Sequence, residues 1–313
     1  MKKKVLVLSA FLLTSAAFCT TKSSGTPGKE FYIQTQTGAV YGSMEKFLYS
    51  SALTDRAVSR LVWEIKPLWY FGLLGGTKLG NFEAQIEFNG ALSLRSGRMF
   101  DYDFTTDGTL TTYSVHEETA VRNAQTSIEL NYALFRTKNV DLKTAVEVFY
   151  SYNSFTARNG YGWYGMNLPE DDPGNCFYEA GRLYGIDYSR HSFYTFAGIA
   201  AELRSGPHWG FTFELMVSPF AYISGLDHHL NASEGTHYME VQYALFKAMK
   251  SSFGIYVNFG TMRASLTCSG LVQSLQKGTL YHDYWSENLS RSDQPCASKN
   301  STANICLSLR KYF

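Results

Sequence analysis

Residues 82–95 read FEAQIEFNGALSLR, in which the even positions are apolar or glycine and most odd positions are polar. A period of two is that of a β-strand with one apolar and one polar face. Shorter runs of the same pattern recur at 128–134, 211–217 and 253–259. Strands of soluble sandwiches are usually about 5 to 6 residues long, so long strands of this kind favour a membrane barrel with a polar interior.

The connections between these runs alternate in length. We expect short links near residues 75–78, 137–140, 205–208 and 250–252, and long ones near 104–118, 159–181, 230–236 and 268–302. Short turns opposed to long loops are typical of outer-membrane barrels, which have an even number of strands in bacteria. A single strand over 82–103 would rise roughly 55 Å, beyond an apolar band of about 25 Å. The expected fold is all-β: a ten-stranded antiparallel transmembrane β-barrel extending above the outer membrane.

The start of the chain has the pattern of an exported protein. Three lysines follow Met1, and the apolar run that comes next, 5–18, is too short to cross a bilayer as a helix. We expect residues 1–18 to be a signal peptide cleaved near 17–19, with lipidation of Cys19 as an alternative. Residues 19–313 would then form a single outer-membrane β-barrel domain.

Composition and the end of the chain agree with this class. The sequence holds 22 Tyr, 22 Phe and 26 Gly, which fits sheets better than helices. A net charge of +1 without a basic cluster argues against nucleic acid as a partner. Residues 307–313 alternate and end in Phe, which is similar to the insertion signal at the C-terminus of outer-membrane barrels.

Two short motifs near predicted strand ends carry candidate chemistry. Residues 101–103 read Asp-Tyr-Asp, and residues 227–229 read Asp-His-His. Because residues i and i+2 of a strand share a face, each motif can direct two functional side chains to the same space. In the strand from Phe82 the even positions are apolar and face outward, so Asp101 and Asp103 are expected to point into the barrel.

The facing of the second motif depends on Pro219. Odd positions are apolar in the strand from Phe211, which would send Asp227 and His229 outward. Proline inside a strand is expected at a bulge, and a one-residue bulge exchanges the two faces. We therefore predict a break near Pro219 that turns Asp227 and His229 inward. His228 then faces the other way, and because adjacent ligands would lie on opposite faces, no metal site is expected here.

Five stretches of the chain resemble the omptins, ten-stranded endopeptidases of the outer membrane. They are SRLVWEIK at 59–66, GRMFDYD at 97–103, SFTAR at 154–158, DHH at 227–229 and LRKYF at 309–313. The resemblance extends over nearly all of the chain after the expected signal peptide, and its two site motifs are the specific part.

The resemblance implies roles for the residues of both motifs. Asp101 and His229 would hold and activate the hydrolytic water, Asp227 would orient the imidazole, and Asp103 would help to position water or substrate. A near-neutral histidine can take a proton from water, and a carboxylate on its other nitrogen fixes the tautomer. His116 matches a loop position near the family's cleft, as does Ser114. Ser114 would complete an imitation of a serine triad, but an exposed loop serine is the preferred interpretation.

The positions that select substrates in the family differ here. Omptins bind a basic residue beside the scissile bond through an acid on the first strand and another two residues before the dyad aspartate. The first position falls on Lys46, with Glu45 as its neighbour, and the second on Gly225. Glu45, Lys46, Gly225 and His116 are thus the candidate substrate-binding residues, and a preference for paired basic residues is not carried over.

The family's lipid-binding pattern is altered as well. Where omptins have Tyr-x-Glu-x-Arg to help hold lipopolysaccharide, residues 148–152 read VFYSY. Activation by lipopolysaccharide is therefore not carried over, and no cofactor is expected.

Five cysteines leave the disulfide pattern open. Cys268 and Cys296 flank the last predicted long loop, and a bridge between them would add about 3 to 4 kcal/mol in an oxidising compartment. Cys176 and Cys306 stay unassigned.

Three functions follow from these observations. The first is an outer-membrane endopeptidase with its active site on the extracellular side, acting on extracellular peptides or proteins. The alternative is a non-proteolytic surface barrel, an adhesin that binds host surface proteins. A narrow pore is disfavoured because about ten strands leave an interior largely filled by side chains. In each case the lipid of the outer membrane surrounds the barrel.

Overall fold

A computed structural model describes residues 29–50, 53–93, 95–164, 176–179, 185–230, 236–284 and 290–313. The expected signal peptide at 1–18, its cleavage near 17–19 and the alternative at Cys19 lie outside these residues. Within the described part of the chain, no helix is long and apolar enough to cross a membrane.

Thirteen strands make up the described secondary structure: β1 Lys29–Ser50, β2 Leu53–Leu79, β3 Phe82–Ser93, β4 Met99–Phe104, β5 Leu110–Arg136, β6 Val140–Tyr164, β7 Cys176–Glu179, β8 Ile186–Ser205, β9 Trp209–His229, β10 Thr236–Ala244, β11 Ala248–Phe259, β12 Met262–Tyr284 and β13 Ser290–Tyr312. β3 and β4 together form one barrel strand between β2 and β5. β10 and β11 form another between β9 and β12. The short β7 pairs with the end of β6.

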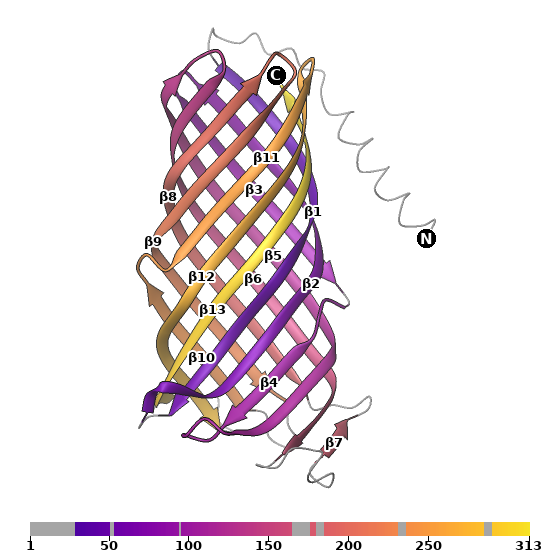
Figure 1. Ribbon diagram of the computed structural model, residues 1–313, viewed down its shortest axis with the longest axis vertical. Helices are drawn as coiled ribbons and strands as arrows, with labels where there is room; N and C mark the ends of the chain where they lie inside the picture. The colour runs from indigo at the N-terminus through magenta and orange to yellow at the C-terminus, as the bar shows by residue number, and fades with distance from the viewer. Residues whose placement is uncertain are drawn as a thin grey trace, which may run out of the picture.

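The strands close into a cylinder. Neighbouring strands are antiparallel throughout the described sheet, and β1 pairs with β13, so the first and last strands meet. Figure 1 shows the resulting tall barrel, with β4 and β7 at the end away from the C-terminus. The predicted ten-stranded antiparallel barrel is confirmed.

The two surfaces of this sheet have opposite character. Large apolar side chains face outward and are open, among them Trp69, Phe88 and Ile128, at 60%, 54% and 54% exposure. Glu129 and Asn131, one and three residues after Ile128 on β5, are buried inside. An apolar belt outside and polar side chains inside are the arrangement of a transmembrane barrel.

One end of the barrel has tight turns, at 80–81, 137–139, 206–208 and 260–261. The links expected at 137–140 and 205–208 are confirmed, but those at 75–78 and 250–252 are wrong. Gly76 lies inside β2, where a Cβ would overlap the ring of Tyr32, so this glycine makes room for an aromatic side chain. Lys250 lies inside β11 and binds Glu147 across the interior at 2.8 Å.

Much of what the sequence predicts as long loops at the other end is strand. Residues 110–118 belong to β5, residues 268–284 to β12 and 290–302 to β13. Beyond the membrane both faces of a strand can be polar, so the period-two signal fades there. Of the other two expected loops, β6 continues through Tyr164, and 231–235 lies outside the described residues.

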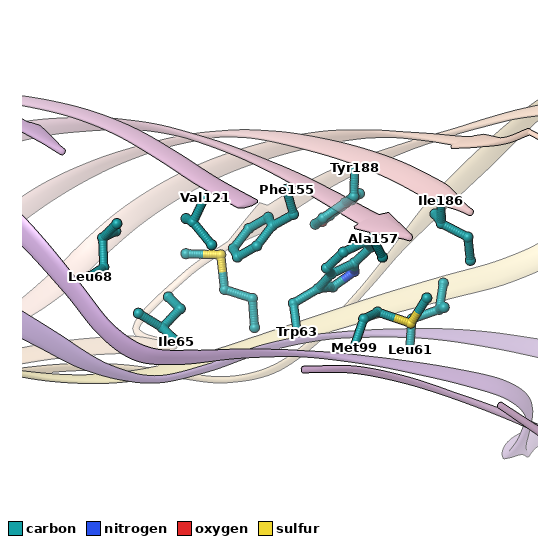
Figure 2. Packing of buried hydrophobic residues seen from close by; sticks show 11 residues of the cluster. Leu61, Trp63, Ile65, Leu68, Met99, Val121, Phe155, Ala157, Ile186 and Tyr188 are labelled. Atoms are coloured by element: carbon teal, nitrogen blue, oxygen red, sulfur yellow. The ribbon is translucent and has the colours of Figure 1, made fainter. Parts of the chain in front are cut away.

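An apolar core crosses the barrel beneath the end that carries β4. Trp63 lies at its centre, with its ring 5.2 Å from Phe155 and 5.9 Å from Tyr188 between centroids. These three side chains come from β2, β6 and β8, and Figure 2 shows them meeting between opposite walls. On the far side of this core lies a polar cavity of about 340 Å³, lined by Glu129 and Lys250 among others. A filled cross-section does not suit a pore.

The bridge considered between Cys268 and Cys296 is excluded by the register of β12 and β13. Cys268 pairs with Ile305, whereas Cys296 pairs with Gly278, ten residues farther along β12. Ten residues of strand span about 33 Å, and a bridge needs Cα atoms within about 7 Å. Cys268, Cys296 and Cys306 are free thiols. The side chain of Cys176 lies outside the described part.

Candidate active site

The predicted break near Pro219 is present and sets the facing of β9. Thr195 pairs with Phe220 and Ala197 with Val217, so Ser218 and Pro219 together oppose one residue of β8. Even positions such as Met216 are buried before this bulge, and odd positions such as Ile223 and Asp227 are buried after it. The bulge exchanges the faces and turns Asp227 and His229 into the barrel.

The other motif is carried by β4, after an interruption of the strand that was expected to be continuous over 82–103. β3 ends at Ser93, Gly97 adopts a φ of +76°, and β4 begins at Met99. Tyr70 pairs with Ala91 and Trp63 with Met99, so the register shifts by one residue across the interruption. Met99 belongs to the apolar core, and Asp101 and Asp103 follow it on the inward face.

The mouth of the barrel, by which we mean the end that carries β4 and β7, lies beyond the apolar belt. On the part of β2 whose side chains are described, from Arg56 to Leu79, the last large exposed apolar side chain on the way to the mouth is Trp69. Leu61, which pairs with Asp101, lies eight residues farther, about 26 Å along the strand. Asp101, Asp103, Asp227 and His229 therefore stand outside the membrane-spanning part.

Three charged groups meet in the wall of the mouth. His229 Nε2 lies 3.3 Å from Asp227 Oδ2, and Lys46 Nζ from β1 donates to the same oxygen at 2.7 Å. Lys46 and Asp227 are each 1% exposed, whereas the His229 side chain is 25% exposed. The His229 ring makes a T-shaped contact with Tyr238 of β10, with centroids 5.3 Å apart. The imidazole is the member of this group that is exposed at the mouth.

Electrostatics separate the carboxylates. Burial and the neighbouring Asp103 raise the pKa of Asp101 to about 7. Burial also raises the pKa of Asp103. Burial acts in the same direction on Asp227, but Lys46 and His229 overcome it and hold the pKa of Asp227 well below its usual range. Asp227 is thus a permanent anion near neutral pH, while Asp101 can hold or release a proton there.

The pKa of His229 reflects opposing influences. Burial lowers it, but Asp227 and Asp101 raise it above the usual histidine value, and Lys46 partly offsets them. Asp101 Oδ1 and Asp227 Oδ1 are buried without a hydrogen-bond partner in the structure, so both retain an acceptor for water or substrate.

Of the four candidate substrate-binding residues, Glu45 faces away from the barrel interior. Its carboxylate pairs with Arg60 at 2.8 Å and Lys299 at 3.0 Å, and both partners are about 40% exposed at the outer surface. Lys46 takes the inward face of β1 instead, because adjacent residues of a strand face opposite sides.

His116 and Gly225 lie on the inward wall, closer to the apolar core than Asp101 and Asp227. His116 is buried, pairs with Met99, and its ring fills the space above Gly160. Burial lowers the pKa of His116 and favours the neutral ring. At Gly225 a Cβ would overlap the carboxylate of Glu240, its partner on β10.

Glu240 and Tyr238 lie on the inward wall of the mouth, opposite Gly225 and Asp227, and the sequence analysis missed them. The carboxylate of Glu240 is fully buried beside Gly225 and accepts hydrogen bonds from Tyr188 at 2.5 Å and Gln242 at 3.0 Å. The signal that could have found them is the polar alternation of Tyr238, Glu240 and Gln242, which places all three on one face.

Among the described residues, no group of three or more His, Cys, Asp or Glu side chains is arranged to hold a metal ion. The roles of Asp101, Asp103, Asp227 and His229 in catalysis stay predictions, although the structure brings the four to one mouth.

Comparisons with known proteins give one strong likeness of fold. The model of the omptin family matches residues 28–280. The outer membrane protease OmpT from Escherichia coli has a TM-score of 0.81 at 16% identity, over 94% of this chain and 100% of that one. At this identity the likeness shows the fold. No curated protein sequence matches the chain.

Two other barrels are similar only in outline. The translocator domain of the autotransporter NalP from Neisseria meningitidis has a TM-score of 0.28 at 6% identity, over 97% of this chain and 95% of that one. The toluene transporter TbuX from Ralstonia pickettii has a TM-score of 0.29 at 10% identity, over 92% and 90%. Neither likeness carries an argument about function.

Proposed function

This chain belongs to the omptin family, and from that membership and the geometry of the mouth we propose that it is an outer-membrane endopeptidase. Its substrates would be extracellular peptides or proteins, because short turns of such barrels face the periplasm and the mouth lies at the opposite end. The observation that carries the proposal is the meeting of His229 and Asp227, 3.3 Å apart, with the inward-facing carboxylates of Asp101 and Asp103.

The proposed reaction is attack by water on a peptide carbonyl. With a proton on Nε2, His229 donates to Asp227, and its Nδ1 lone pair can take a proton from a water held against Asp101. Burial and the negative charge of Asp103 raise the pKa of Asp101, so that one carboxyl of the Asp101–Asp103 pair can stay protonated near neutral pH. Refolded protein should cleave members of a peptide library, and Asp101→Asn should abolish the cleavage. A wild-type barrel that cleaves nothing in a broad library would contradict the proposal.

We also propose a cleavage preference other than paired basic residues. The acid nearest to Gly225 is Glu240, and both of its oxygens already accept hydrogen bonds from protein side chains. Lys46 brings a positive charge to the same wall. Glu240 therefore has no oxygen free of protein hydrogen bonds for the ammonium or guanidinium of a substrate.

Peptides that differ only at the cleavage site test this preference. An Arg-Arg peptide and its Ala-Ala counterpart should differ in kcat/KM by less than about tenfold, because a tenfold preference needs about 1.4 kcal/mol of selective interaction. Sequencing of products from a mixed library gives the preference without bias. Strong selection of Arg-Arg or Lys-Lys bonds would show that the pocket retains a basic specificity.

Activity is expected to be independent of lipopolysaccharide. Tyr150 and Tyr152 face outward on the same side of β6 as Val148, and the Tyr150 hydroxyl binds His191 at 2.7 Å. This surface is aromatic, without the Glu and Arg of the family's lipid-binding pattern. Refolded barrel in detergent should cleave a library equally with and without added lipopolysaccharide. Activity that arises only after the lipid is added would overturn this expectation.

A further inference from the structure

Lys46 forms a buried ion pair with Asp227, the carboxylate that also contacts His229. Its ammonium donates to Asp227 Oδ2 at 2.7 Å, and both side chains are 1% exposed. It also lies 5.5 Å from the centre of the Tyr238 ring, which packs against His229 as well. A lysine so enclosed can reach a substrate only by abandoning Asp227, so its influence on the reaction must pass through that carboxylate.

The charges around His229 explain why such a cation matters. β9 contributes Asp227 and the neighbouring His228, and β4 contributes Asp101 and Asp103. β10 contributes the ring of Tyr238, and β8 presents the uncharged Ile186 opposite the histidine. Lys46 on β1 is the cation of this set. Three carboxyl groups without a cation would favour an imidazolium, which cannot accept a proton from water.

The ion pair also fixes a geometry. One oxygen of Asp227 is shared by Lys46 and His229, so the ammonium holds the carboxylate in the plane from which it meets the imidazole. Loss of one partner of a buried pair leaves the other charge uncompensated. Without Lys46, the imidazole of His229 is the remaining described partner of this Asp227 oxygen, which favours the protonated ring.

We propose that Lys46 is a positioning residue of the proposed active site. It holds Asp227 against His229 and supplies the positive charge that keeps the imidazole available as a base. This inference rests on the proposed peptidase function. It also changes the role of Lys46 from a substrate-binding residue to a partner of the proposed catalytic machinery.

The pH profile of cleavage tests the proposal. His229 works as a base when it is neutral, so kcat/KM falls as the pH drops below the pKa of His229. Lys46→Met removes a cation that lowers this pKa, and the acid limb should move upward by about one pH unit. Lys46→Arg keeps the charge and should restore the wild-type limb. Lys299→Met is the matched control, because Lys299 binds Glu45 at the outer surface, 42% exposed.

A direct titration of His229 keeps the inference separate from the proposed function. Histidine-labelled protein in detergent gives the midpoint by NMR, with the His229 signal assigned by its loss in His229→Gln. Lys46→Met should raise the midpoint whether or not peptides are cleaved, and Lys46→Gln serves if the methionine variant does not fold. A midpoint unchanged in these variants, or shifted equally in Lys299→Met, overturns the role of Lys46. Wild-type protein that cleaves no peptide overturns the peptidase proposal alone.

Discussion

His229→Ala is expected to lower kcat by about 10²- to 10⁴-fold, the range that general-base help contributes in other hydrolases. The imidazole lies 3.3 Å from Asp227 and is the exposed member of the pair. Removal of the ring takes away the proton acceptor while the barrel wall stays in place. Steady-state cleavage of a library-derived peptide measures the loss. KM should change little, because the proposed role of the ring is to accept the water proton and not to bind the peptide.

His228→Ala is the matched control for this prediction. The two histidines are adjacent on β9, but the ring of His228 stacks on His237 with centroids 4.0 Å apart, on the opposite face of the strand. Its loss should leave kcat near the wild-type value. Equal losses in both variants would mean that the strand end as a whole matters, and full activity in His229→Ala would remove the histidine from the mechanism.

The membrane part of the fold could be predicted from the sequence because lipid covers one face of each strand there. Period-two alternation such as that of residues 82–95 then follows from the fold, and the barrel was predicted correctly. The mouth gave no such signal, since lipid covers neither face of its strands. Residues 110–118 were therefore predicted as loop, and the assumed loop around Cys268 and Cys296 led to a bridge that the register excludes.

In the candidate site, features set by neighbouring residues could be predicted from the sequence, whereas contacts between distant residues could not. The bulge near Pro219 was predictable because a proline cannot donate to the ladder, and it decided the facing of Asp227. The interruption before β4 was not predicted, although Gly97, with its φ of +76°, marks it. Lys46 and Asp227 are 181 residues apart in sequence, so no local pattern pairs them. The β1–β13 contact and the closed ring bring them together.

Trp63→Ala is expected to lower the free energy of unfolding by about 3–5 kcal/mol, the usual cost of removing a large aromatic side chain from a core. Trp63 is 1% exposed and packs on Phe155 and Tyr188, so its loss leaves a cavity directly beneath the mouth. Denaturant unfolding of the barrel in detergent, followed by tryptophan fluorescence, measures the change.

Trp69→Ala provides the control from the same strand. Trp69 faces the lipid side and is 60% exposed, so detergent can fill the space it leaves, and the loss should be clearly smaller. Because Trp63 pairs with Met99, two residues before Asp101, a collapse of the core should also displace the carboxylates. At denaturant concentrations below its unfolding midpoint, where the barrel is still folded, we therefore expect Trp63→Ala to have a lower kcat than the wild type. Trp69→Ala should leave kcat unchanged. Equal stability losses in the two variants would show that the apolar core does not support the mouth.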